Sequence, residues 1–90
     1  MPELVLTREA REHLDALPAI AQEAVGETIT ALALDPRAIG KPLLGRLRGR
    51  WSAAVGNYRV LYTIEEGTAS SRIVVRAIRH RAVAYRTRRR

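Results

Sequence analysis

The chain has 90 residues, of which 47% are hydrophobic and 28% are charged, a composition that fits one small folded domain and excludes an intrinsically disordered protein. It contains no cysteine and only two histidines, which excludes disulfides and thiolate metal sites, so we expect neither a metal nor another cofactor. Because no signal peptide or bilayer-spanning apolar run can be identified, we expect a cytoplasmic protein without membrane association.

The formal net charge is +7, and the excess positive charge lies in the second half of the chain. Residues 1–45 contain four basic and seven acidic residues, a net charge of −3, whereas residues 46–90 contain twelve arginines and two glutamates, a net charge of +10. Codon bias and function explain the large number of arginines equally well. Only the positions of the arginines therefore indicate a function. Guanidinium groups match phosphate oxygens, and the second half is expected to bind a polyanion.

The first half predicts a strand followed by a helical hairpin. Residues 3–6 form a short apolar strand candidate, and Thr7 is a suitable N-cap for an amphipathic helix that extends through residue 17. Pro18 fits the first turn of a second helix, which Asp35 and Pro36 end. His13 lies on the first of these helices, and we expect it to have a structural role.

The second half predicts a sheet. A glycine-rich loop over residues 39–49 precedes it. Three strands are then expected, over residues 50–55, 58–65 and 71–79. The turns between them are short, which implies antiparallel hairpins.

Charged side chains interrupt the apolar pattern from His80 onward. We expect a helical turn around residues 82–86 and a frayed basic tail over residues 86–90. The sequence therefore predicts a single α+β domain over residues 1–90. In this domain an N-terminal strand and a helical hairpin pack on a mainly antiparallel four-stranded sheet, and a short helical turn follows.

Alternation along the middle strand separates a core side from a polar side. The core side is expected to hold Tyr58, Val60, Tyr62 and Ile64. Arg59 therefore points away from the core. In a regular last strand Arg79 shares a side with the apolar Ile73, Val75 and Ala77, although its place at the strand end still allows it to reach the rim of the other face.

Hairpin closure is expected to gather Arg50, Arg59, Arg79 and Tyr85 around one phosphate. Metal-free RNA cleavage needs such a group, because a base must take the 2′-hydroxyl proton, cations must stabilise the charge on phosphorus and an acid must protonate the leaving oxygen. An alternative remains open at this point: the same arginines are solvated strand residues that keep the sheet edges from pairing with other chains.

Several sequence blocks together resemble the signature of the RelE/ParE toxin superfamily, over essentially the whole chain. The blocks are Leu47-Arg48-Gly49, Trp51-Ser52, Asn57-Tyr58-Arg59-Val60-Leu61-Tyr62, Arg79-His80-Arg81 and Tyr85-Arg86. The resemblance implies a RelE-like toxin of a type II toxin–antitoxin system. Such a toxin is a ribosome-dependent mRNA endonuclease that works without metal and is neutralised by a cognate antitoxin.

The resemblance also implies roles for individual residues. Arg59 and Arg79 match phosphate-stabilising arginines, and Tyr85 matches a late tyrosine that positions the substrate. Arg50 stands where related toxins have a catalytic lysine, and Ser52 replaces a second one. The general base is open between His80 and Tyr85, and for His80 a purely structural role at the strand end is the alternative.

The remaining arginines of the second half are expected to contact RNA outside the reacting phosphate. They are Arg46, Arg48, Arg76, Arg81 and Arg86. Trp51 is expected to be a core anchor more than a base-stacking platform. The expected partners are the ribosome, mRNA and an acidic, partly helical antitoxin. Two other functions stay open: inhibition of DNA gyrase, as in ParE-like toxins, and inactive binding of RNA or the ribosome.

Overall fold

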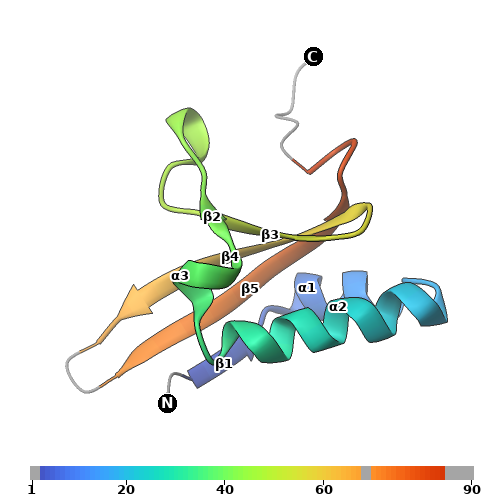
Figure 1. The fold of residues 1–90 in the computed structure, drawn as a ribbon, viewed down its shortest axis with the longest axis horizontal. Coiled ribbons are helices and arrows are strands. Elements are labelled where there is room, and N and C mark those ends of the chain that lie inside the picture. The colour runs from blue at the N-terminus through green and yellow to red at the C-terminus, as the bar shows by residue number, and fades with distance from the viewer. Residues whose placement is uncertain (1–2, 68–69, 85–90) are drawn as a thin grey trace.

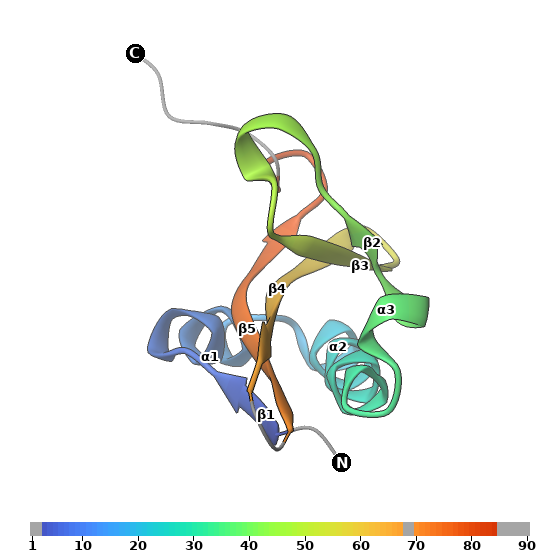
Figure 2. The same ribbon diagram turned by 90° about the vertical axis from the view of Figure 1, so that its left-hand side faces the viewer.

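The computed structural model describes residues 3–67 and 70–84. In chain order its elements are β1 (Glu3–Leu6), α1 (Arg8–Asp15), α2 (Ala19–Leu32), α3 (Pro36–Ile39), β2 (Lys41–Pro42), the 3-10 helix η1 (Gly45–Leu47), β3 (Trp51–Val55), β4 (Tyr58–Glu66) and β5 (Ser71–His80). Helices α1 and α2 lie on one side of a twisted sheet, and η1 lies on the other side (Figures 1 and 2). The predicted α+β fold is confirmed. No helix in the described ranges has both the length and the apolar character needed to cross a membrane.

The sheet has five strands in the order β1-β5-β4-β3-β2, one more than predicted. β1 pairs with β5 in parallel, and the other pairs are antiparallel. The additional strand consists of Lys41 and Pro42, which lie inside the predicted loop. They pair with Ser52 and Trp51 of β3. Two residues are too short to show an alternating pattern, and proline is tolerated because this strand lies at the sheet edge.

The helix boundaries follow from local capping. The Thr7 side chain accepts a hydrogen bond from the Ala10 N–H at 3.1 Å and caps α1 as predicted, although α1 ends at Asp15, before residue 17. Asp35 accepts the Ala38 N–H at 3.2 Å. Asp35 therefore starts the short helix α3 just after α2 ends, an element that the sequence analysis did not predict.

The end of the last strand and the segment after it differ slightly from the prediction. β5 continues to His80, one residue beyond the predicted end. Residues 81–84 form a turn, in which the Val83 N–H donates to the His80 carbonyl oxygen at 2.9 Å. The rest of the predicted helical turn and the basic tail over residues 86–90 lie outside the described residues.

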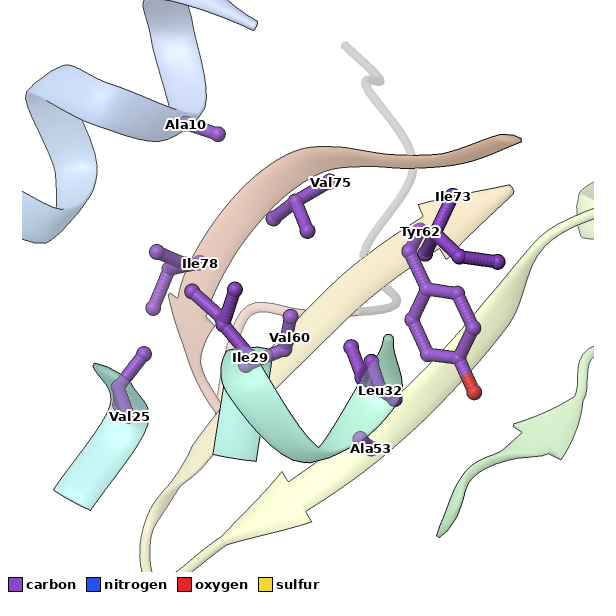
Figure 3. Close-up of a cluster of buried hydrophobic side chains, with 10 residues drawn as sticks. All are labelled: Ala10, Val25, Ile29, Leu32, Ala53, Val60, Tyr62, Ile73, Val75 and Ile78. Carbon is purple, nitrogen blue, oxygen red and sulfur yellow. The ribbon is translucent and has the colours of Figure 1, made fainter. Parts of the chain in front are cut away.

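The hydrophobic core lies between the two longer helices and the sheet (Figure 3). It consists of Ala10, Val25, Ile29, Leu32, Ala53, Val60, Tyr62, Ile73, Val75 and Ile78. Trp51 is partly buried against this cluster and stacks on Tyr62, with ring centroids 6.3 Å apart. The expectation that Trp51 anchors the core is confirmed.

Tyr62 ties the segment after α2 to the sheet. Its buried hydroxyl donates a hydrogen bond to the Pro36 carbonyl oxygen at 2.5 Å. A side chain at Gly40 would overlap this hydroxyl group. Burial raises the pKa of Tyr62 to about 12, although a backbone hydrogen bond from Gly40 acts in the opposite direction. The tyrosine therefore remains neutral, and α3 is held against the edge of the sheet.

Candidate functional site

A β-bulge in β5 determines which side chains reach the face of the sheet that the α-helices α1 and α2 leave uncovered, called here the helix-free face. Tyr62 of β4 pairs with Val75, but the preceding Leu61 pairs with Ala77, so Arg76 is the extra residue. Beyond the bulge the alternation of β5 is inverted. Arg79 therefore does not share the core side with Val75, as regular alternation predicted.

The inverted alternation places Arg79 beside Arg59. The two residues are register partners on β5 and β4, while Val60 and Ile78, one step along, are both in the core. Directly opposed residues in antiparallel strands have Cβ atoms about 4.5–5.5 Å apart. The structure thus brings together the two arginines that the sequence assigned to one phosphate.

Neither member of this arginine pair is neutralised in the described part of the chain. Arg59 is half-buried, and its Nη1 donates to the Gly56 and Tyr58 carbonyl oxygens at 3.2 and 2.9 Å. Arg79 is exposed. Within residues 3–67 and 70–84, the ion pairs involve other arginines. Two like charges held side by side without a carboxylate favour the binding of an anion between them.

The opposite end of the helix-free face is neutralised, and we call it the paired end. Arg72 lies 3.4 Å from Glu3 and 3.9 Å from Glu65, and Arg76 lies 3.1 Å from Glu65. The Arg76 Nε also donates to the Thr63 hydroxyl oxygen at 3.1 Å. Arg76 was predicted to bind RNA, but its guanidinium is engaged here, away from the arginine pair.

Apolar and small residues separate these two ends. Leu61 and Val74 are buried, with exposed fractions of 7% and 6%, yet neither belongs to the core cluster beneath the helices. The register partner of Arg59 on β3 is Ala54, whose short side chain leaves room next to the guanidinium. Ser52, where the resemblance places a lysine, is buried and so is shielded from a substrate.

Four further predicted residues lie on segments next to the helix-free face. Both η1 and the turn at residues 81–84 are on the side of the sheet away from α1 and α2 (Figures 1 and 2). These segments and the residues just after η1 carry the exposed arginines Arg46, Arg48, Arg50 and Arg81. The Arg81 N–H donates to the Asn57 carbonyl oxygen at 2.7 Å, a link that no residue pattern could have revealed because it depends on register.

Arg50 starts from a backbone position some distance from the arginine pair. It precedes β3, whose residue Ala54 is in register with Arg59. Four residues of extended chain separate Arg50 from Ala54, which corresponds to about 13 Å. Tyr85, the fourth member of the predicted group, lies outside the described residues. Arg86 does so as well.

His80 faces away from the arginine pair. Its ring lies edge-on to Tyr58, with centroids 5.7 Å apart, and Tyr58 packs against the core on the side of the helices. The His80 Nδ1 accepts the Ala82 N–H at 3.1 Å. This hydrogen bond is the contact expected of a residue that caps the strand end, and it engages Nδ1.

The arrangement is suited to holding a phosphate rather than a metal. In the described ranges, no three side chains of His, Asp or Glu are grouped closely enough to ligate a metal ion. The arginine pair offers two planar donor groups from adjacent strands, and each can bind phosphate oxygens in a bidentate manner. Adjacent strands fix the backbone positions of both donors, so only the side chains need to order when an anion binds.

Comparisons with known proteins agree with this geometry. Residues 4–85 match the family described as ParE toxin of type II toxin-antitoxin system, parDE. The chain is 37% identical over 85 residues to toxin RelG of Mycobacterium tuberculosis, covering 89% of this chain and 91% of that protein. It is 36% identical over 84 residues to toxin RelE of the same organism, covering 92% and 84%.

A solved structure shows the same fold. The crystal structure of the toxin-antitoxin complex RelBE2 from Mycobacterium tuberculosis contains a chain that is 36% identical to this one, with a TM-score of 0.77. The similarity covers 90% of this chain and 100% of that chain. On sequence and fold together, this protein belongs to the RelE/ParE family of toxins from type II toxin–antitoxin systems.

Proposed function

We propose that this toxin is a RelE-type mRNA endonuclease that cuts messages on the translating ribosome in the cytoplasm. The observation that carries the proposal is the arginine pair, Arg59 and Arg79, held in register on the helix-free face and without a carboxylate partner in the described residues. The relatives named RelG and RelE, at 37% and 36% identity, support the same assignment.

The proposed reaction is transfer of the phosphate within the RNA. The 2′-hydroxyl oxygen forms a bond to the adjacent phosphorus, the bond from phosphorus to the 5′ oxygen breaks, and a 2′,3′-cyclic phosphate and a free 5′-hydroxyl result. The arginine pair would stabilise the charge that develops on the phosphate oxygens. Because His80 faces the other side, we propose Tyr85 or a ribosomal group for the proton transfers.

We also propose that the exposed arginines beside this face hold the RNA and the ribosome. Arg46, Arg48 and Arg81 lie on segments next to the helix-free face, where they would contact backbone phosphates. A cognate antitoxin would neutralise the toxin, as the RelBE2 complex is a toxin with its antitoxin. An acidic segment fits this partner best because it would lie over residues 46–90, which carry a net charge of +10.

The test is to induce wild-type toxin and the variants Arg59→Ala, Arg79→Ala and Tyr85→Ala in cells and map the 5′ ends of translated messages. Arg72→Ala is the matched control, because Arg72 lies on the same strand as Arg79 but at the paired end. Cuts within codons that disappear in Arg59→Ala and Arg79→Ala, but persist in Arg72→Ala, would support the endonuclease. Cuts that persist in both arginine-pair variants would reject it.

A second function, inhibition of DNA gyrase, is kept because the matching family is described by its ParE toxin. One feature of the site favours it: the register partners around the arginine pair, Ala54 and Ala77 with Leu61, supply no proton-transfer group. The same experiment separates the two functions. Growth arrest with intact messages and broken chromosomal DNA would establish the gyrase inhibitor instead.

A further inference from the structure

The strand that carries Arg79 continues past the end of its neighbour, β1. β1 pairs with β5 only as far as Val75. Beyond that point, the Thr7 N–H donates to the Val75 carbonyl oxygen at 3.0 Å, and the Thr7 hydroxyl donates to the Arg76 carbonyl oxygen at 3.3 Å. The Ile78 N–H then donates to Nδ1 of His13 at 3.2 Å. Polar groups of α1 and its N-cap therefore replace a strand along the bulged edge of β5.

The bulge decides on which face Arg79 lies. In the observed register Arg59 is opposite Arg79. If β5 paired regularly from Val75 onward, Arg59 would be opposite Ile78, and Arg79 would be opposite Tyr58. A shift by one residue moves every following side chain to the other face of the sheet. Loss of the bulge would therefore remove Arg79 from the helix-free face.

We infer that His13 is a positioning residue for the arginine pair: through its hydrogen bond to the Ile78 N–H, it holds the bulged register that places Arg79 beside Arg59. His13 lies on α1, on the side of the sheet opposite the pair, and so has no access to a substrate bound there. The consequence for RNA rests on the proposed function, whereas the consequence for the register does not.

The chemistry of the contact explains why a histidine fits. The Ile78 N–H is partly buried and points away from β4, and a buried amide without an acceptor is costly. An unprotonated Nδ1 supplies that acceptor from a rigid ring on a helix. Asparagine can place its side-chain oxygen near the position of Nδ1, while the longer glutamine places it near Nε2, so these two substitutions test the position of the acceptor.

The experiment compares His13→Asn and His13→Gln in the full-length toxin, with Leu14→Ala as a control. Leu14 is the next residue on α1 and packs against the core, so its truncation weakens packing without touching the bulge. Two NMR measurements report on the register: the cross-strand nuclear Overhauser contact between Arg59 and Arg79, and hydrogen exchange of the Ile78 amide. Affinity for a 2′-O-methyl RNA oligonucleotide, which cannot be cleaved, reports on the site.

In His13→Gln the contact between Arg59 and Arg79 should weaken, and the Ile78 amide should exchange about tenfold faster. RNA affinity should fall about tenfold, towards that of Arg79→Ala, because the second donor is misplaced. His13→Asn and Leu14→Ala should keep the wild-type register and affinity. A His13→Gln variant that keeps both would overturn the inference, as would a protonated Nδ1 on His13 in the wild-type protein at neutral pH.

The two proposals can fail separately. If Arg79→Ala binds the oligonucleotide as tightly as wild type does, the proposed function loses its support. The role of His13 is then decided by the two NMR measurements alone. If His13→Gln does not fold, the nitrogen chemical shifts of His13 in the wild-type protein still report whether Nδ1 accepts a hydrogen bond, and a shift typical of a free nitrogen rejects the inference.

Discussion

The two faces of the sheet serve different purposes, although the same strands build both. The face beneath α1 and α2 is apolar and buried, and all ten residues of the core lie there or on the helices that cover it (Figure 3). The helix-free face carries charged groups, which are neutralised at the paired end, whereas at the arginine pair no carboxylate from residues 3–67 or 70–84 does so. The alternation of side chains thus separates the residues that stabilise the fold from those proposed to bind an anion, and we expect the two properties to change independently.

The largest expected effect lies on the covered face. Leu32 of α2 is fully buried in the core, and Leu32→Ala should lower the free energy of unfolding by about 2–5 kcal/mol because it leaves a cavity. Urea denaturation measures this change. The affinity of the remaining folded molecules for RNA should equal that of wild type, and a loss of affinity under fully folding conditions would contradict the separation of the two faces.

The next effect concerns the arginine pair itself. Arg59→Glu would place a carboxylate opposite Arg79 and turn this site into a second paired end. RNA cleavage on programmed ribosomes should fall by about 10²–10³, the typical cost of losing one donor to a developing oxyanion. Urea denaturation should show a loss of about 1–3 kcal/mol, because the half-buried Arg59 gives up its hydrogen bonds to the Gly56 and Tyr58 carbonyl oxygens. Cleavage at the wild-type rate would show that the charge of this pair is not needed.

A third effect is confined to the covered face and appears only at high pH. Tyr62 has a pKa raised by burial from 10.0 to about 12. Between these values the unfolded chain has lost the proton and the folded chain retains it, so stability falls as pH rises. The loss should amount to roughly 2–3 kcal/mol between pH 10 and pH 12. Denaturation midpoints of wild type and Tyr62→Phe measure it, and equal slopes in both would reject the assignment.

Much of this fold could be predicted because its strands alternate regularly where one face is buried. The pattern around Arg59 in β4 placed apolar residues on the core side, and Val60 and Tyr62 are there. The N-cap at Thr7 was predictable for a similar reason, because capping depends on residues that are close in sequence. Local rules suffice for both features.

The position of Arg79 could not be derived from local rules. Regular alternation assigned it to the core side, and the bulge at Arg76 moved it to the other face. The groups that satisfy the bulged edge, Thr7 and His13, are separated from their partners by 69 and 65 residues. His13 was expected to be structural, but only the three-dimensional contact shows which backbone group it binds. A register shift of this kind depends on such distant contacts.

The smallest effect tests whether charge alone explains the difference between the two ends of the helix-free face. Glu65→Gln would remove the carboxylate partner of Arg76, while Arg72 would keep its ion pair with Glu3. Stability should fall by less than about 1 kcal/mol, because these side chains are partly exposed, and urea denaturation measures that change. RNA affinity should rise only slightly, through the change in net charge. A gain as large as the loss in Arg79→Ala would mean that any unpaired arginine on this face binds RNA, and that the register holding Arg79 beside Arg59 has no special role.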